Sequence, residues 1–164
     1  MLVIGIDPGT RRTGYGIVRR RASGFEVIDY GCIRPPAHGP ATAETYLALF
    51  EGIEYLVSKY PIEALAVETQ YVHKNVQSAI KLGMARGVAV LAASRKRIPV
   101  FEYTPSKAKL AVVGNGRASK EQVALMTQRL LGLKELPEPE DAADALALAV
   151  CHLQSITMRE RGYV

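Results

Sequence analysis

The sequence has few cysteines, histidines and aspartates: two, three and four among 164 residues. Cys32 and Cys151 lie far apart and form no Cys-x-x-Cys pair, which argues against a disulfide framework. We interpret them as reduced, buried thiols of a cytosolic protein. His38, His73 and His152 do not cluster in the sequence, so we assign none of them to a metal.

Long apolar runs are also missing. No stretch approaches the roughly 20 apolar residues of a membrane-spanning helix, so we expect no membrane segment. The chain begins directly with a strand-like run, and we therefore expect no signal peptide and a cytoplasmic protein. The sequence has no internal repeat, no low-complexity segment and no linker. We expect a single domain over residues 1–157, followed by a frayed C-terminal tail over 158–164.

Basic residues outnumber acidic residues in this sequence. The formal net charge is +5 and the sequence pI is near 9.3, which favours an anionic partner, with nucleic acid first. Residues 69–120 contain ten basic residues and one acid, whereas residues 121–144 contain six acids and two bases. A basic surface could hold a polyanion while the acids hold a metal. Composition alone favours the simpler alternative of two solvated helix faces with opposite charge.

Hydrophobic periodicity and turn residues predict the elements. Leu2–Ile6 is a β-branched apolar run, typical of a strand buried on both faces. Further strands are predicted over 14–19, 25–33, 64–67 and 99–103, and helices over 42–59, 75–97, 105–113, 119–131 and 139–157. This order predicts an α/β domain with a mixed five-stranded sheet, a three-strand antiparallel meander plus two parallel strands, flanked by helices.

Acidic residues end two of the predicted strands. Asp7 follows the first strand and Glu68 follows the fourth, so parallel neighbours would bring both carboxylates to one sheet edge. Asp141 and Asp144 share one face at the start of the last helix. Four carboxylates from three elements need compensating charge, which Mg²⁺ or Mn²⁺ supplies. Two such ions roughly 3.5–4 Å apart are the usual device for attack on a phosphodiester.

Each acid taken alone also has an ordinary explanation. Asp141 and Asp144 could be surface acids that interact favourably with the helix macrodipole. Asp7 could form a turn at the strand end, and Glu68 could pair with a lysine. The order strand-Asp, strand-Glu, helix-Asp-x-x-Asp favours the metal interpretation when all four are taken together.

A series of motifs resembles the bacterial RuvC Holliday-junction resolvases of the ribonuclease-H-like superfamily. The resemblance covers roughly residues 1–155. The motifs are Gly-Ile-Asp-Pro-Gly-Thr at 5–10, Thr-Gly-Tyr-Gly at 13–16, Glu68 followed by Tyr71 and Lys74-Asn75, Leu-Gly-Met-Ala-Arg-Gly at 82–87, Val-Val-Gly-Asn-Gly at 112–116, and Asp-Ala-Ala-Asp-Ala-Leu-Ala at 141–147.

The resemblance implies a ribonuclease-H-like fold and a homodimer that cuts two opposed strands of a four-way DNA junction in recombination and repair. It implies 5′-phosphate and 3′-hydroxyl products, and the proteins RuvA and RuvB as branch-migration partners. Asp7, Glu68, Asp141 and Asp144 would be the acidic quartet that binds Mg²⁺, two ions per active site, with Mn²⁺ as a substitute. Some relatives carry His where this chain has Asp141, so the quartet here is fully carboxylate.

Further roles follow from the same resemblance. Lys109 and Lys120 match basic positions near the scissile phosphate, and Lys109 would stabilise the charge of the transition state. Tyr71 matches an aromatic position, usually Phe, that stacks on bases. The other residues implied are Lys74, Lys107 and Arg117 for DNA binding, and Gly83, Met84 and Gly87 for the dimer interface. Without the resemblance, the lysines would be ordinary solvated side chains, Tyr71 would be a packing residue, and the long helix would pack on its own sheet.

Three other functions remain open from the residues themselves. Asp-x-Gly-Thr after a first strand also occurs in actin-like ATPases and sugar kinases, but these need a second related domain and leave Asp141 and Asp144 unexplained. A non-catalytic junction-binding module explains the basic residues but not the four acids. A ribonuclease-H-like nuclease that acts on RNA is disfavoured only by the resemblance.

Overall fold

The computed structural model describes residues 1–36, 43–69 and 75–160 of the chain. One mixed sheet has the strand order β3-β2-β1-β4-β5. The strands are β1 Leu2–Asp7, β2 Thr13–Arg21, β3 Gly24–Ile33, β4 Ala64–Glu68 and β5 Val100–Tyr103. The first three strands pair antiparallel, and β1, β4 and β5 are parallel, which confirms the predicted sheet.

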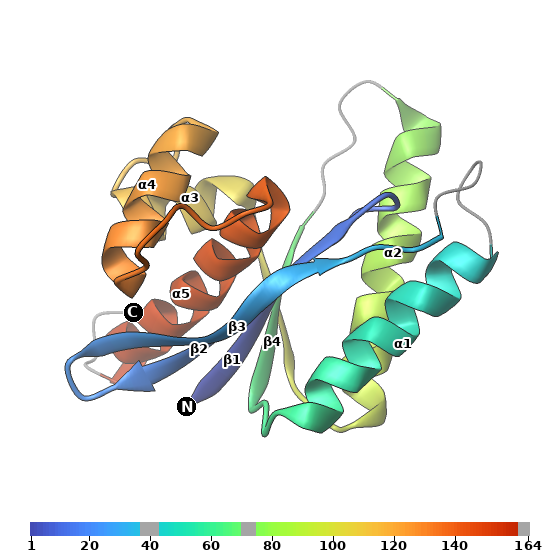
Figure 1. Ribbon diagram of the computed structural model, residues 1–164, viewed down its shortest axis with the longest axis horizontal. Coiled ribbons are helices and arrows are strands. Elements are labelled where there is room, and N and C mark those ends of the chain that lie inside the picture. Colours follow the sequence, from blue (N-terminus) through green and yellow to red (C-terminus); the bar gives the residue numbers. More distant parts are fainter. Residues whose placement is uncertain (37–42, 70–74, 161–164) are drawn as a thin grey trace.

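Helices cover both faces of this sheet (Figure 1). They are α1 Ala43–Lys59, α2 Val76–Arg95, α3 Pro105–Val113, α4 Lys120–Leu131 and α5 Glu140–Glu160. One hydrophobic core joins the sheet to α1 and α2, and a second core on the opposite face joins it to α3, α4 and α5. The result is three layers with the sheet in the middle, and the carboxyl ends of β1, β4 and β5 lie at the upper edge in Figure 1.

Glycines allow α5 to lie directly on β1 and β2. A Cβ atom at Gly5 would collide with the carbonyl oxygen of Ala145, and one at Gly14 would collide with the carbonyl oxygen of Asp141. Packing densities in protein interiors leave no room for such an overlap. Because Gly14 is paired with Asp7 in the antiparallel register, this contact brings the start of α5 beside the end of β1.

The structure differs from two expectations, one about the end of the last helix and one about the burial of the cysteines. Helix α5 continues to Glu160 rather than ending near Thr157, because the Arg20 guanidinium donates hydrogen bonds to Thr157 Oγ1 (3.1 Å) and Glu160 Oε2 (2.8 Å). Cys32 and Cys151 are both free thiols, but only Cys151 is buried. Cys32 is half-buried because it lies near the end of the edge strand β3. Thr42 and residues 161–164 fall outside the described ranges.

Helix α2 is the one described helix that is long and apolar enough, by length and composition alone, to cross a membrane. The prediction that no stretch reaches this limit is therefore wrong for α2. A single helix of this kind is weak evidence of a membrane protein, and α2 contains Lys81 and Arg86.

Candidate active site

The sheet and α5 bring the acidic residues to one edge of the fold. In the parallel pairing of β1 with β4, Ile6 lies opposite Val67, so the next residues, Asp7 and Glu68, leave their strands at the same edge. The start of α5 lies at this edge too, and Asp144 is one helical turn beyond Asp141.

A cavity of about 290 Å³ opens among these elements. It is lined by Asp7, Glu68, Pro105, Ala108, Lys109, Lys120, Val123, Asp144 and Ala147. Three of the four predicted acids and both predicted catalytic-site lysines therefore face one space. Asp141 is not among the lining residues.

The three acids in the cavity resist ionisation. Burial, together with the nearby carboxylates of Glu68, Asp144 and Asp141, raises the pKa of Asp7 from 3.8 to about 8. Burial and then Asp144 raise the pKa of Glu68 from 4.5 to about 7, although Lys120 and Lys109 oppose the rise. Burial also raises the pKa of Asp144, again against Lys120. If all three acids were ionised, the cavity would hold more negative charge than its two lysines neutralise.

The two lysines come from helices whose starts are fixed by side-chain caps. Thr104 caps α3, and Ser119 forms a capping box with Gln122 at the start of α4. Lys109 of α3 donates a 2.7 Å hydrogen bond from Nζ to the carbonyl oxygen of Ala118, which immediately precedes the Ser119 cap. This bond ties α3 to the start of α4 beside the cavity.

Lys120 is paired with the acids at the start of α5. Its Nζ lies 3.1 Å from Glu140 Oε1 and 3.4 Å from Asp144 Oδ2. Burial lowers the pKa of Lys120, but the hydrogen bonds and charges of Glu140 and Asp144 outweigh burial and raise it overall. Lys120 is therefore a permanent cation at the rim of the cavity.

Asp141 is turned toward a different cation. Its Oδ2 lies 3.2 Å from Nε of Arg12, in the loop between β1 and β2. This oxygen is buried and has no hydrogen-bond partner among the residues that the structure describes. The pair is therefore an electrostatic contact rather than a hydrogen bond, and Asp141 is the one acid of the four that does not line the cavity.

Comparison with known proteins assigns this arrangement to a family. The sequence model of the family described as crossover junction endodeoxyribonuclease RuvC matches residues 3–152. The chain belongs to the RuvC family. A RuvC of Protochlamydia amoebophila (strain UWE25) is 55% identical over 163 residues, which span 99% of this chain and 96% of that relative. A RuvC of Moorella thermoacetica is 48% identical over 161 residues, spanning 98% and 96% of the two chains.

Solved structures agree with the RuvC assignment. The structure of Thermus thermophilus RuvC in complex with Holliday junction substrate matches with a TM-score of 0.90 at 35% identity, covering 97% of this chain and 96% of that one. The yeast mitochondrial Holliday junction resolvase Ydc2 matches with a TM-score of 0.69 at 15% identity, covering 98% and 82%. At that identity the likeness to Ydc2 concerns the fold alone.

The other DNA-binding residues expected from the sequence either lie outside the cavity or fall outside the described residues. Lys107 is exposed, with Nζ 5.2 Å above the ring of Tyr103, and it does not line the cavity. Arg117 is exposed just before α4. Tyr71 and Lys74 lie outside the described residues, as do His38 and His73.

The predicted dimer residues lie on the open side of α2. Gly83 and Gly87 are exposed, and a Cβ atom added at either would meet no heavy atom of the described chain within 4 Å. Met84 beside them is 51% exposed. Helix α2 packs on the sheet of its own chain, as the alternative expected, through Ala85, Ala89, Ala92 and Ala93. This packing leaves Gly83, Met84 and Gly87 on the opposite side, and their role in a dimer stays a prediction.

Sequence reasoning missed two contributors to this RuvC-type site, Arg12 and Glu140. Arg12 is the second residue after the Asp-Pro-Gly-Thr motif, so a basic residue in the loop after the strand-end acid was the available signal. Glu140 precedes Asp141, and no local pattern indicated that its carboxylate would bind Lys120. Both pairs join residues more than 15 positions apart in the sequence.

The donor set fits a hard divalent cation by its chemistry. No three of the described acids, histidines and cysteines are close enough to form a metal-binding group. The crowded carboxylates nevertheless oppose each other's ionisation, and Asp141 presents a buried oxygen without a hydrogen-bond partner. Both features are relieved by a cation that prefers oxygen ligands, such as Mg²⁺.

Proposed function

We propose that this chain is a cytoplasmic, divalent-metal-dependent endonuclease that resolves four-way DNA junctions by paired cuts in opposed strands, acting as a homodimer. One observation carries the proposal: Asp7, Glu68 and Asp144 share a cavity with Lys109 and Lys120 in a chain of the RuvC family. The match to an RuvC structure that holds a Holliday junction supports four-way DNA as the substrate. The actin-like alternative and the binding-module alternative leave these three acids without a role.

The carboxylates would hold Mg²⁺, with Mn²⁺ as a substitute. Asp7, Glu68 and Asp144 would supply oxygens from the cavity, and Asp141 would join them from the same face of α5. When bound, such metals supply an activated water and stabilise the leaving oxygen of the scissile phosphate. Because the pKa values of Asp7 and Glu68 are raised, a bound cation would favour their ionised, metal-binding forms over the protonated forms.

The lysines would act on the phosphate itself. Lys109 lines the cavity, and its bond to the Ala118 carbonyl holds the ammonium group there with further donors free for a phosphate oxygen. A fixed cation in a partly desolvated cavity stabilises the negative charge that builds up in the transition state. Lys120 would serve the same phosphate, while Lys107, Arg117, Tyr71 and Lys74 would extend the contact along the DNA. The expected products carry 5′-phosphate and 3′-hydroxyl ends.

The apolar face of α2 supports the homodimer. Val76, Ile80, Met84 and Leu91 are each more than half exposed, and their spacing of four and seven residues places them on one side of the helix. Gly83 and Gly87 lie on the same side and would let a second backbone approach closely. A twofold dimer would present two equivalent cavities to a twofold-symmetric junction. Contacts with RuvA and RuvB remain a prediction from the family resemblance.

Cleavage of a synthetic four-way junction tests the proposal. Wild type, Asp7→Asn and Asp29→Asn are each incubated with the junction or with linear duplex of the same sequence, in Mg²⁺ or EDTA. Asp29→Asn is the matched control, because Asp29 lies on β3 and pairs with Tyr60 and Lys59 instead of facing the cavity. We expect paired, Mg²⁺-dependent cuts in the junction alone, lost in Asp7→Asn with binding kept and retained in Asp29→Asn.

Two results would overturn the proposal. Tight junction binding without cleavage by wild type, in either Mg²⁺ or Mn²⁺, would favour the non-catalytic binding module. Nucleotide hydrolysis without junction binding would favour the actin-like alternative.

A further inference from the structure

Arg12 occupies a distinctive place beside the proposed metal site. Its guanidinium forms an ion pair with Asp141, with 3.2 Å between Nε and Oδ2, yet half of the Arg12 side chain is exposed to solvent. The Asp141 oxygen that it faces is buried and makes no hydrogen bond within the described part of the chain. The contact therefore neutralises a desolvated charge without the directed bonds of a fixed arginine–carboxylate pair.

The two partners differ in their freedom to move. The backbone of Asp141 is held against Gly14, where no side chain could be accommodated, so the start of α5 is fixed on the sheet. Arg12 lies in the loop between β1 and β2, and its long side chain is solvent-exposed. If Asp141 gains a different cation, Arg12 is the partner that can leave.

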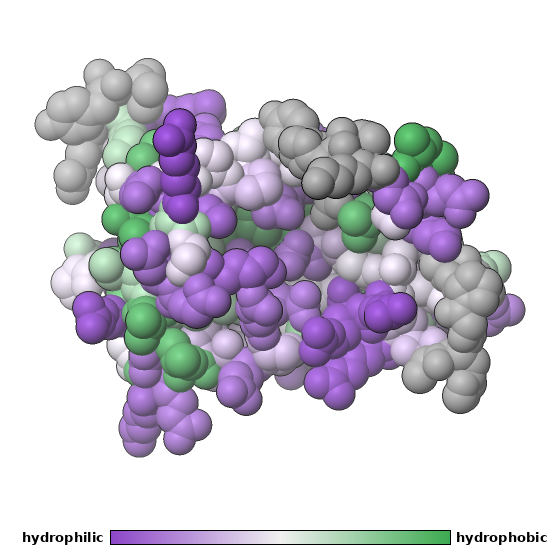
Figure 2. All heavy atoms as spheres, turned by 90° about the horizontal axis from the view of Figure 1, so that it is seen from above, coloured by the Kyte–Doolittle hydropathy of each residue, from purple (hydrophilic) through white to green (hydrophobic). Residues whose placement is uncertain are grey.

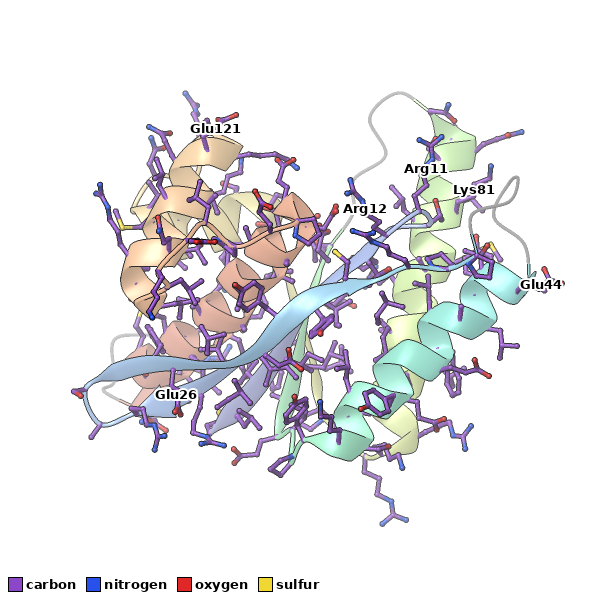
Figure 3. The ribbon with its side chains drawn as sticks, viewed as in Figure 1. Arg11, Arg12, Glu26, Glu44, Lys81 and Glu121 are labelled. Carbon is purple, nitrogen blue, oxygen red and sulfur yellow. The ribbon has the colours of Figure 1, made fainter. Side chains whose placement is uncertain are left out.

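Arg12 is also on the side of the molecule that the proposed substrate would approach. Arg11 and Arg12 lie at the upper edge of the fold, where Lys81 of α2 lies as well (Figure 3). Seen from above, hydrophilic side chains dominate the described surface of this face (Figure 2). A guanidinium released from Asp141 would remain at this edge, where phosphate oxygens are suitable partners for it.

We propose that Arg12 is an exchangeable counterion: it neutralises Asp141 in the metal-free protein, competes with a divalent cation for that carboxylate, and binds junction phosphate when the cation displaces it. This inference rests on the proposed function and adds a positioning residue to it. Two consequences follow. Removing the guanidinium makes cation binding to the DNA-free protein tighter, and it weakens the coupling between cation binding and junction binding.

The first consequence is tested by titrating Mn²⁺ into the DNA-free protein and following bound Mn²⁺ by electron paramagnetic resonance. The variants are Arg12→Gln, Arg12→Lys, Arg11→Gln and Asp7→Asn. We expect Arg12→Gln to bind Mn²⁺ about two- to fivefold more tightly than wild type, the range typical of a partly exposed ion pair. Arg12→Lys keeps the competing charge and stays near wild type. Arg11→Gln is the matched control, because this neighbouring arginine pairs with no carboxylate among the residues that the structure describes, and it leaves the affinity unchanged.

The second consequence is tested by junction affinity in Ca²⁺ and in EDTA, with Ca²⁺ as a divalent probe. Wild type gains more affinity from Ca²⁺ than Arg12→Gln does, by a factor of about two to five. An equal gain in both proteins, or unchanged or weaker Mn²⁺ binding by Arg12→Gln, would overturn the role of Arg12.

The Asp7→Asn variant shows whether a negative result rejects only the role of Arg12 or also the proposed function. Loss of Mn²⁺ binding in Asp7→Asn with no effect of Arg12→Gln would remove only the role given to Arg12. If Asp7→Asn binds Mn²⁺ as tightly as wild type, the carboxylates are not the metal site, and both proposals fall together.

Discussion

Asp7 is a buried acid at the end of the central strand, and its environment opposes its charge. Burial and three neighbouring carboxylates raise its pKa from 3.8 to about 8. In the unfolded chain Asp7 is ionised above about pH 4, whereas the folded, metal-free protein keeps the proton up to about pH 8. Folding therefore takes up a proton in this range, so the free energy of unfolding falls as the pH rises.

We expect the metal-free protein to lose about 1–2 kcal/mol of unfolding free energy between pH 6.5 and pH 8. His152 opposes this decline only weakly, because burial lowers its pKa from 6.5 to about 4 and the unfolded chain has already lost about half of this proton at pH 6.5. Urea unfolding in EDTA across the window measures the slope. Asp7→Asn carries no titrating group at this position and should give a flatter profile.

Saturating Mg²⁺ supplies the opposite charge and should remove most of the decline in wild type, because a ligand that binds only the folded state stabilises it. A wild-type slope equal to that of Asp7→Asn in EDTA would show that Asp7 ionises normally and that the carboxylates are not crowded.

At the scale of elements, the contact between α5 and β2 sets the position of Asp141. In Gly14→Ala, the added methyl group would overlap the carbonyl of Asp141, so the start of α5 must move outward. We expect a loss of about 1–3 kcal/mol in unfolding free energy. Because a displacement of catalytic groups by about 1 Å can lower the rate 10²-fold, we expect junction cleavage to fall by that order.

Chemical denaturation and a single-turnover cleavage assay measure the two effects of Gly14→Ala, and junction binding shows whether the DNA surface persists. Asp141 keeps its own side chain in this variant, so lost cleavage with retained binding reports its displacement. Cleavage at the wild-type rate would mean that α5 adjusts without moving the acids.

Local signals predicted the elements well, and the site only in part. The helices predicted over 105–113 and 119–131 start within one residue of α3 and α4, because capping depends on residues within one turn, here Thr104 and the Ser119–Gln122 pair. The sheet-edge position of Asp7 and Glu68 followed from strand order, which the alternation of strands and helices indicates. The contact of Arg12 with Asp141 was not predictable in this way, because it depends on how α5 lies against Gly14.

At the scale of the whole molecule, the exposed apolar face of α2 is the predicted contact between two subunits. Ile80 and Met84 are 57% and 51% exposed, while the opposite side of α2 is buried. A contiguous apolar stripe of this kind is typical of a protein–protein interface. We expect Ile80→Glu and Met84→Glu to convert a dimer to a monomer in sedimentation velocity experiments, because each places a charge in the apolar contact. Leu47→Glu on α1, where Leu47 is 55% exposed, is the matched control and should remain dimeric.

Paired cutting should disappear with the dimer. A dimer on the four-way junction of a plasmid-borne cruciform can cut both opposed strands before it dissociates, and the product is linear DNA. A monomer has one cavity and cuts one strand, which relaxes the supercoiling that maintains the cruciform, and the product is a nicked circle. We therefore expect Ile80→Glu to give nicked circles and Leu47→Glu to give linear DNA at the same protein concentration. Linear product from Ile80→Glu, at a concentration where sedimentation shows only monomer, would mean that the two cuts do not require two subunits joined through α2.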